Sequence, residues 1–206
     1  MKKIILFTLC TLISHSIFAA QEGRFVQKDN IFPQVEIVTS LGNIVVELDR
    51  SKAPITVNNF LTYVMDKSYQ GSVFHRVERD VENDRDFVIQ GGGYDKDYDG
   101  LHENDPIFNE SGNGLKNDMY SIAMAYQDRE PHTGTRQFFF NMENNDHLNP
   151  GREWGFAVFG NVMDGYDTLD KIMAVKTGFN EKIGYDFVPV DPVVILNIKV
   201  LAHTPL

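Results

Sequence analysis

The chain has 206 residues, 42% of them hydrophobic and 12% aromatic, which excludes a globally disordered chain and suits one folded domain. Its 19 Lys and Arg against 29 Asp and Glu give a net charge of −10, and without a basic cluster this argues against binding to nucleic acid. No apolar run reaches the length of about 18 residues that a membrane-spanning helix requires.

The N-terminus has the three parts of a secretory signal. Two lysines precede a mostly apolar run over residues 4–13, and small residues follow at Ala19 and Ala20. We predict that residues 1–19 are a signal peptide, cleaved near Ala19 or Ala20. Export to the periplasm follows, with full secretion as the alternative, and the mature chain is not expected to contact the membrane. The only cysteine lies in this segment, so disulfides are not expected in the mature domain.

The mature chain begins with a polar stretch and continues as a hairpin. Residues 20–33 are predicted to form a loosely held arm, and residues 34–206 to form one domain. Two runs rich in β-branched residues, 35–39 and 44–48, are separated by turn-forming residues and predict a pair of antiparallel strands.

Further along the chain, helical spacing alternates with short apolar runs. Pro54 opens a segment in which Val57, Phe60, Leu61 and Val64 fall on one face of a helix. Short apolar runs then predict elements near 73–77, 87–90, 120–125, 137–141, 155–160 and 193–200, with a second helix over 165–173. Many short strands with two helices, and no regular βαβ alternation, indicate an antiparallel barrel or sandwich with helices at its ends.

Several common catalytic and metal-binding patterns are missing. The mature chain has no cysteine, its histidines lack paired metal-ligand spacing, and no GxSxG motif occurs. Residues 95–100 match the first half of a calcium-binding loop, but Pro106 stands where the strongest acidic ligand is needed. We therefore expect a solvated acidic loop, with no metal site and no cofactor.

Five segments are distinctive as an ordered set. They are Phe-His-Arg-Val at 74–77, Phe-Val-Ile-Gln-Gly-Gly-Gly at 87–93, Ile-Ala-Met-Ala at 122–125, Gln-Phe-Phe at 137–139 and Phe-Ala-Val-Phe-Gly at 156–160. Over residues 35–201 this order and spacing resemble the cyclophilin family of peptidyl-prolyl cis-trans isomerases, particularly its secreted bacterial members. The resemblance implies a mainly β fold, a closed eight-stranded antiparallel barrel capped by two α-helices, with a peptide groove on its outer face.

The same resemblance assigns the site. Catalytic roles fall on Arg76, Gln90 and Phe87, and the substrate-binding positions are Val88, Ala125, Tyr126, Gln137, Phe139, His147, Leu148 and Phe156. His147 and Phe156 depart from the best-known eukaryotic members, which carry Trp and His there. Arg136 stands where a small serine is usual, and the sequence offers no physical reason for it.

Rotation about an X–Pro bond needs no nucleophile or metal. The barrier of roughly 18–20 kcal/mol comes from amide resonance, so the enzyme must bind the twisted amide better than either planar form. The guanidinium of Arg76 can donate to the prolyl carbonyl and to the imide nitrogen, while apolar side chains hold the ring. Gln90 and Gln137 are expected to orient Arg76 and the peptide, and the backbone at Ala125 and Tyr126 to make a strand-like contact. His75 is expected to be a structural, hydrogen-bonding histidine, because the reaction moves no proton.

The predicted function is isomerisation of X–Pro bonds during the folding of exported proteins. The expected partners are proline-containing unfolded or partly folded polypeptides, and the chain is expected to be a monomer. A non-catalytic proline-peptide-binding chaperone on the same scaffold is the alternative, followed distantly by an unrelated ligand-carrying barrel. Residues 78–86 contain five acidic residues and replace a short turn of the family. They are expected at one rim of the groove, either as a solvated loop or as a negative field that attracts basic substrates.

Overall fold

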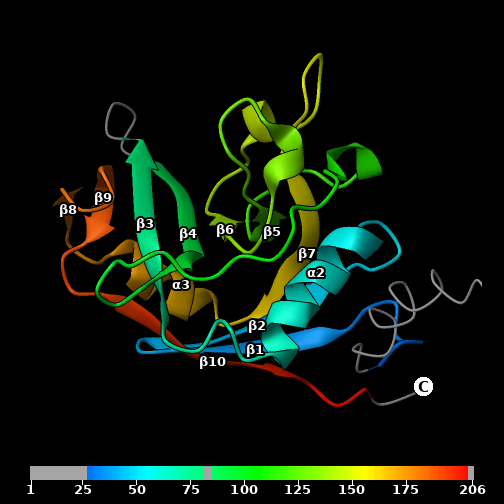
Figure 1. The fold of residues 1–206 in the computed structure, drawn as a ribbon, viewed down its shortest axis with the longest axis horizontal. Helices are drawn as coiled ribbons and strands as arrows, with labels where there is room; N and C mark the ends of the chain where they lie inside the picture. The colour runs from blue at the N-terminus through cyan, green and yellow to red at the C-terminus, as the bar shows by residue number, and fades with distance from the viewer. Residues whose placement is uncertain (1–26, 81–84, 204–206) are drawn as a thin grey trace, which may run out of the picture.

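A closed antiparallel barrel dominates residues 27–80 and 85–203, the part of the chain that the computed structural model describes (Figure 1). The strands are β1 (Gln34–Thr39), β2 (Gly42–Leu48), β3 (Ser72–Asp80), β4 (Arg85–Asp95), β5 (Ser121–Met124), β6 (Phe138–Asn141), β7 (Ala157–Asp164) and β10 (Val193–Val200). They follow one another around the barrel in the order β1–β10–β3–β4–β6–β5–β7–β2. The predicted eight-stranded barrel is confirmed, whereas the predicted signal peptide lies outside the described residues.

Alternating side chains explain why these segments form a barrel wall. In β1, Val35 and Ile37 are fully buried and their chain neighbours are partly exposed, which is the pattern of a strand with one face on the core. Val35 pairs with Val46 of β2, and Ile37 with Ile44, so both strands turn their apolar residues to the same side. A one-residue slip would move these side chains to the solvent face, and this fixes the register.

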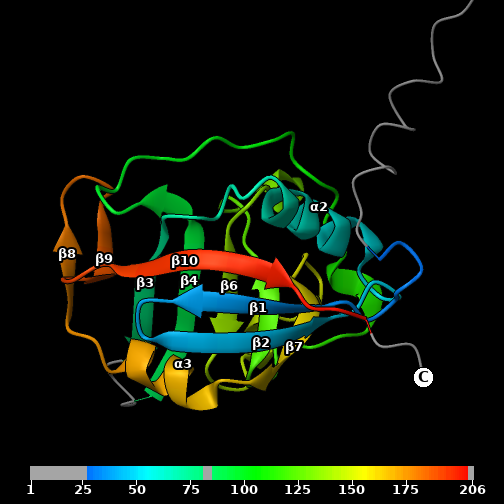
Figure 2. The ribbon, with the colours of Figure 1, turned by 90° about the horizontal axis from the view of Figure 1, so that it is seen from below.

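Two α-helices, α2 (Pro54–Met65) and α3 (Tyr166–Met173), pack on opposite sides of the barrel, as Figure 2 shows. The predicted apolar face of α2 is buried in the core. No side chain of its own caps the start of α2; instead the carboxylate of Glu110 accepts bonds from the amides of Ile55 and Thr56 at 3.1 and 2.8 Å. No helix among the described residues has the length and apolar character to cross a membrane.

A second, smaller sheet was not expected from the sequence. Strands β8 (Thr177–Asn180) and β9 (Tyr185–Pro189) form a hairpin beside β3, visible at one end of the molecule in Figure 2. Most of its side chains are at least partly exposed, so it lacks the apolar alternation that identified the barrel strands. The described loops also contain three short 3-10 helices, η1 (Ser111–Asn113), η2 (Pro131–Thr133) and η3 (Asp146–Leu148).

The described part of the N-terminal arm is anchored rather than loosely held. Arg50, just after β2, donates from Nη1 to the carbonyls of Gln27 and Asn30 at 2.8 and 2.6 Å. The amide of Leu48 bonds the carbonyl of Pro33 at 2.9 Å, which continues the attachment up to β1. The polar sequence of residues 27–33 did not indicate this attachment, because the segment is held through its backbone carbonyls.

Arg136 now has a physical explanation. Its side chain is buried, and its guanidinium donates to the carbonyls of His102 and Ser68 at 2.7 and 2.6 Å. The rings of Tyr63 and Tyr69 lie 5.2 and 5.5 Å from its Cζ, where a cation is attracted by the ring faces. Arg136 therefore links the segments at Ser68 and His102 to Tyr63 of α2. It comes immediately before Gln137 in the chain, and its role is structural.

Candidate active site

Cross-strand register brings the predicted arginine next to the predicted pocket. Arg76 on β3 pairs with Gln90 on β4, and Gln90 pairs with Phe139 on β6. Phe138 and Phe140, the chain neighbours of Phe139, are buried in the main core, so Phe139 faces the opposite, outer side of the barrel. The three side chains therefore form one row across the outer wall.

A second apolar cluster, separate from the barrel core, surrounds Phe139. We call it the outer cluster; its buried members are Val88, Ala123, Phe139 and Val158, and Phe87, Leu115, Ala125, Leu148 and Phe156 pack against it. The rings of Phe139 and Phe156 meet edge to face at 5.3 Å, and Tyr126 stacks on Phe156 at 4.4 Å. On the other side, His147 stacks on Phe87 at 5.4 Å. The structure thus brings together all the predicted apolar and aromatic substrate-binding residues.

Two hollows on the surface are lined by predicted site residues. One, of about 420 Å³, is bordered by Phe87, His147 and Glu78, and the other, of about 240 Å³, by Gln90, Gln137 and Tyr126 among others. Predicted site residues line both hollows, so the hollows and the outer cluster together make up the candidate groove for an extended peptide.

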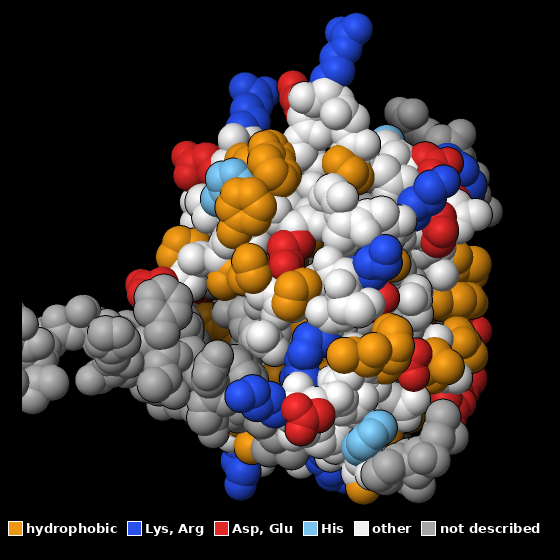
Figure 3. Space-filling model, turned by 90° about the vertical axis from the view of Figure 1, so that its right-hand side faces the viewer, with side chains coloured by type: hydrophobic (Ala, Val, Ile, Leu, Met, Phe, Trp, Pro, Cys, Tyr) orange, Lys and Arg blue, Asp and Glu red, His pale blue; other side chains and the backbone are white. Residues whose placement is uncertain are grey.

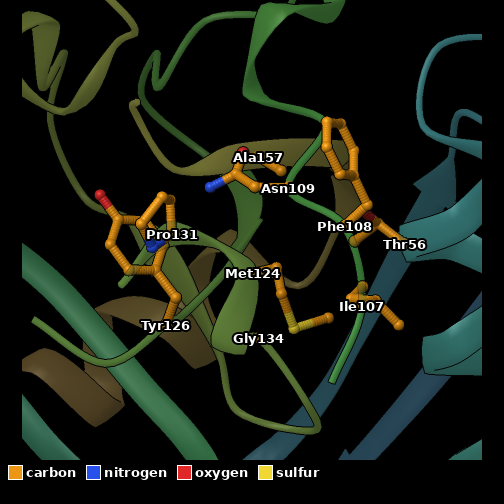
Figure 4. A pocket seen from close by; sticks show the side chains of 9 residues that line it. All are labelled: Thr56, Ile107, Phe108, Asn109, Met124, Tyr126, Pro131, Gly134 and Ala157. Atoms are coloured by element: carbon orange, nitrogen blue, oxygen red, sulfur yellow. The ribbon is translucent and has the colours of Figure 1, made fainter. Parts of the chain in front are cut away.

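A third pocket lies behind Tyr126 and is shown in Figure 4, with Tyr126 and Phe108 on either side of Met124. Its volume of about 10 Å³ is roughly the room for one water molecule. A hollow of this size is too small for a pyrrolidine ring.

An exposed aromatic cluster continues from the groove wall. The hydroxyl of Tyr126 donates to the carbonyl of Trp154 at 3.2 Å, and Trp154 contacts the ring of His132 at 4.8 Å. Phe108 stacks on His132 at 4.6 Å and is 54% exposed. Figure 3 shows hydrophobic side chains gathered next to a histidine on this face. Aromatic surface therefore extends beyond the residues that the sequence assigned to the groove.

The immediate partners of Arg76 are not the expected ones. Gln90 donates its side-chain amide to Gln137 at 2.9 Å, so the two amides hold each other. The guanidinium of Arg76 instead forms an ion pair with Glu78, Nη2 to Oε2 2.7 Å, and its Cζ lies 5.9 Å from the ring centre of Tyr185. Burial raises the pKa of the Glu78 carboxyl, and the charge of Arg76 opposes that rise.

Sequence reasoning missed both partners as site residues. Glu78 follows Arg76 by two positions on one strand, so their side chains share a face, and this spacing was a usable signal. Tyr185 lies on β9, which the sequence did not predict, and no local pattern connects it to Arg76.

The acidic segment 78–86 is, where described, an extension of the β3–β4 hairpin rather than a loop. Arg79 pairs with Asp86 across the strands, with a side-chain distance of 3.4 Å, and Glu78 pairs with Arg76. Two of the acids in this segment therefore pair with arginines, which weakens the alternative of a negative field.

His75 is buried, with its ring 4.8 Å from that of Tyr94. Neither ring nitrogen makes a hydrogen bond of acceptable geometry, so the predicted hydrogen-bonding role is wrong. Burial lowers the pKa of His75 to about 4. The imidazole is therefore neutral near pH 7 and packs as an aromatic ring, in keeping with a structural role.

This lowered pKa predicts an acid-sensitive fold. Below pH 6.5, the ordinary pKa of histidine, His75 becomes protonated in the unfolded chain. In the folded chain it stays neutral until the pH falls to about 4. The free energy of unfolding should fall through that window and stop responding to His75 below it. Urea unfolding at several pH values would show a shallower decline for His75→Gln, and parallel curves for both proteins would contradict the prediction.

Residues 95–100 bind a lysine instead of presenting free carboxylates. Lys182 reaches the carboxylate of Asp99 and the carbonyl of Asp97, both at 2.7 Å, while Asp95 accepts two backbone amides of its own loop. Within residues 27–80 and 85–203, no three His, Cys, Asp or Glu side chains gather into a metal-binding group.

The barrel interior is filled by large side chains such as Phe60, Phe74 and Phe138. The interior is therefore packed with side chains and leaves no room for a ligand inside the barrel. Comparison with known proteins identifies the family. Residues 34–200 match the family model described as "Cyclophilin type peptidyl-prolyl cis-trans isomerase/CLD".

Relatives and solved structures agree. A peptidyl-prolyl cis-trans isomerase of Streptomyces antibioticus is 47% identical over 81% of this chain and 98% of its own length. Isomerase A of Dickeya dadantii is 38% identical over 98% of this chain and 99% of its own. A crystal structure of a Cryptosporidium parvum cyclophilin-type isomerase has a TM-score of 0.62 and 26% identity, covering 84% of this chain and 99% of that one. The chain belongs to the cyclophilin-type peptidyl-prolyl cis-trans isomerases and is an enzyme of that class.

Proposed function

We propose that Arg76 and the outer cluster carry the isomerase activity of this chain. The observation that supports this most is the placement of a partly exposed guanidinium one strand away from Gln90 and two strands away from the apolar pocket around Phe139. A twisting prolyl amide combines an apolar pyrrolidine ring with a ring nitrogen that becomes basic, so it matches an apolar pocket next to a guanidinium.

The chemistry is differential binding without any covalent change. As the C–N bond twists, the imide nitrogen regains its lone pair and accepts a hydrogen bond, which only the transition state offers. Arg76 supplies the donor, while Phe139, Phe156 and Leu148 hold the pyrrolidine ring. Lowering the barrier by about 7 kcal/mol corresponds to roughly 10⁵-fold acceleration.

The substrates that we propose are X–Pro bonds in unfolded or partly folded exported polypeptides. A second Cryptosporidium parvum cyclophilin structure, with 25% identity and a TM-score of 0.62, was solved in the presence of the dipeptide Ala-Pro. That likeness supports binding of a proline-containing peptide to this fold.

Titration of the mature chain with an Ala-Pro peptide, followed by NMR, tests the groove assignment. Resonances of Phe139, Phe156 and the backbone at Ala125 should shift together. Shifts confined to the pocket behind Tyr126 would contradict the assignment.

We also propose that the chain acts in the periplasm after removal of residues 1–19. Expression of the whole chain in a Gram-negative bacterium should give a periplasmic product that begins near residue 20. Edman sequencing of that product and fractionation against cytoplasmic markers would measure this. An uncleaved cytoplasmic product would contradict it.

A further inference from the structure

Arg76 has to meet the twisted amide in one orientation, yet its side chain stands on the outer wall of the barrel and is 35% exposed. An arginine in this setting samples many rotamers, and each bound substrate would have to select one of them. The two glutamines beside it bond each other, Gln90 to Gln137 at 2.9 Å. Other side chains must therefore hold the guanidinium in the free enzyme.

Glu78 contacts the guanidinium from the same strand. Its Oε2 lies 2.7 Å from Nη2 of Arg76, and its side chain is only 19% exposed. The contact is an ion pair without the geometry of a hydrogen bond. Because both side chains are partly shielded from water, the attraction is stronger than that of a fully exposed pair. Because only one nitrogen is engaged, Nε and Nη1 stay available for the substrate.

Tyr185 contacts the guanidinium from the unpredicted hairpin. Its ring centre lies 5.9 Å from Cζ of Arg76, within the range of a cation–π contact. Tyr185 also borders the same hollow as Gln90 and Gln137, so its ring stands at the edge of the candidate groove. The β8–β9 hairpin, packed beside β3, carries it there.

We propose that Glu78 and Tyr185 are positioning residues that hold the guanidinium of Arg76 from two sides in the orientation used for catalysis. This inference rests on the proposed role of Arg76. The carboxylate fixes the direction of Nη2, and the ring limits motion of the guanidinium plane. Preorganisation of this kind raises the rate of the chemical step rather than the affinity for the peptide.

The main test measures kcat and KM of the mature chain on an Ala-Pro peptide. Glu78→Ala should lower kcat by about tenfold and leave KM within about twofold, because the donor is misplaced while the apolar pocket is intact. Glu78→Gln should lower kcat to a similar extent, because it keeps the shape of the side chain and removes the charge that forms the ion pair. Tyr185→Ala should lower kcat by a smaller factor of about three.

A matched control is Glu36→Gln on the barrel wall. Glu36 is 23% exposed and pairs with Lys199 at 3.1 Å, which resembles the Glu78 pair away from the groove. It should leave both constants unchanged. An unchanged or raised kcat in Glu78→Ala would overturn the proposal, because the carboxylate would then be idle or would compete with the substrate for Arg76.

NMR of the Arg76 side chain separates this inference from the proposed function. The Nε–H group should be ordered in the wild type and mobile in both Glu78→Gln and Glu78→Ala. If Arg76 proves dispensable for isomerisation, the proposed mechanism fails while this measurement still reports whether Glu78 holds the guanidinium. Equal order in all three proteins would overturn the positioning role.

Discussion

Arg76→Ala is expected to lower kcat/KM for an Ala-Pro peptide by about 100- to 1000-fold, the usual cost of removing a donor that stabilises a transition state. The free energy of unfolding should change by less than about 1 kcal/mol, because Arg76 is partly exposed and its single ion pair contributes little to stability. The loss of rate should therefore occur in a fully folded protein.

Lys199→Ala provides the matched control for Arg76→Ala. Lys199 is another cation on a barrel strand, paired with Glu36 at 3.1 Å, and lies on β10 outside the groove. Urea unfolding and a coupled isomerase assay would be run on both variants. A folded Arg76→Ala protein with wild-type turnover would refute the mechanism.

Phe139→Ala is expected to weaken both the fold and the binding of peptide. Phe139 is 4% exposed and contacts the ring of Phe156 at 5.3 Å, so its loss leaves a cavity in the outer cluster. The cost in unfolding free energy should be about 3 kcal/mol, with a rise in KM because the proline ring loses its wall.

The neighbouring residue supplies the control for Phe139→Ala. Phe138 is as deeply buried but faces the barrel core, where it packs against Phe60 and Phe74. Phe138→Ala should destabilise the fold by a similar amount and leave the KM of the folded fraction unchanged. If the two variants had the same KM, the proline pocket would not lie at Phe139.

The barrel could be predicted because its strands carry local signals. Residues 193–200 form β10 with the bounds expected from their apolar run, and the hairpin of β1 and β2 follows from its β-branched runs around a turn. The helix from Pro54 follows from the spacing of its apolar residues. In each case the pattern that defines the element lies within the element itself.

What could not be predicted depends on contacts between distant segments. The start of α2 is capped by Glu110, and the buried guanidinium of Arg136 binds the carbonyls of Ser68 and His102. The β8–β9 hairpin lacks apolar alternation because much of it is exposed. Tyr185 contacts Arg76 because that hairpin packs beside β3. No local sequence pattern could therefore predict this contact.

The resemblance predicted which apolar residues gather at the candidate site. It did not predict which side chain pairs with Arg76. Val88, Phe139, Leu148 and Phe156 gather in one cluster because alternate residues of neighbouring strands share a face. The partner of Arg76 was assigned to glutamines, although Glu78 was the acid two residues along the same strand. The alternation of side chains along a strand was used only for apolar residues. Applied to charged residues as well, it predicts the pair of Arg76 and Glu78.

The central claim is that the guanidinium of Arg76, beside the outer cluster, accelerates rotation of the prolyl bond. NMR exchange spectroscopy on one Ala-Pro peptide measures binding and cis-trans interconversion together, with the wild type and with Arg76→Lys. The account predicts rapid interconversion with the wild type, and similar binding but a loss of most of the rate with Arg76→Lys, which keeps the charge and loses the planar fork of donors. Binding without interconversion by the wild type, or full catalysis by Arg76→Lys, would contradict it.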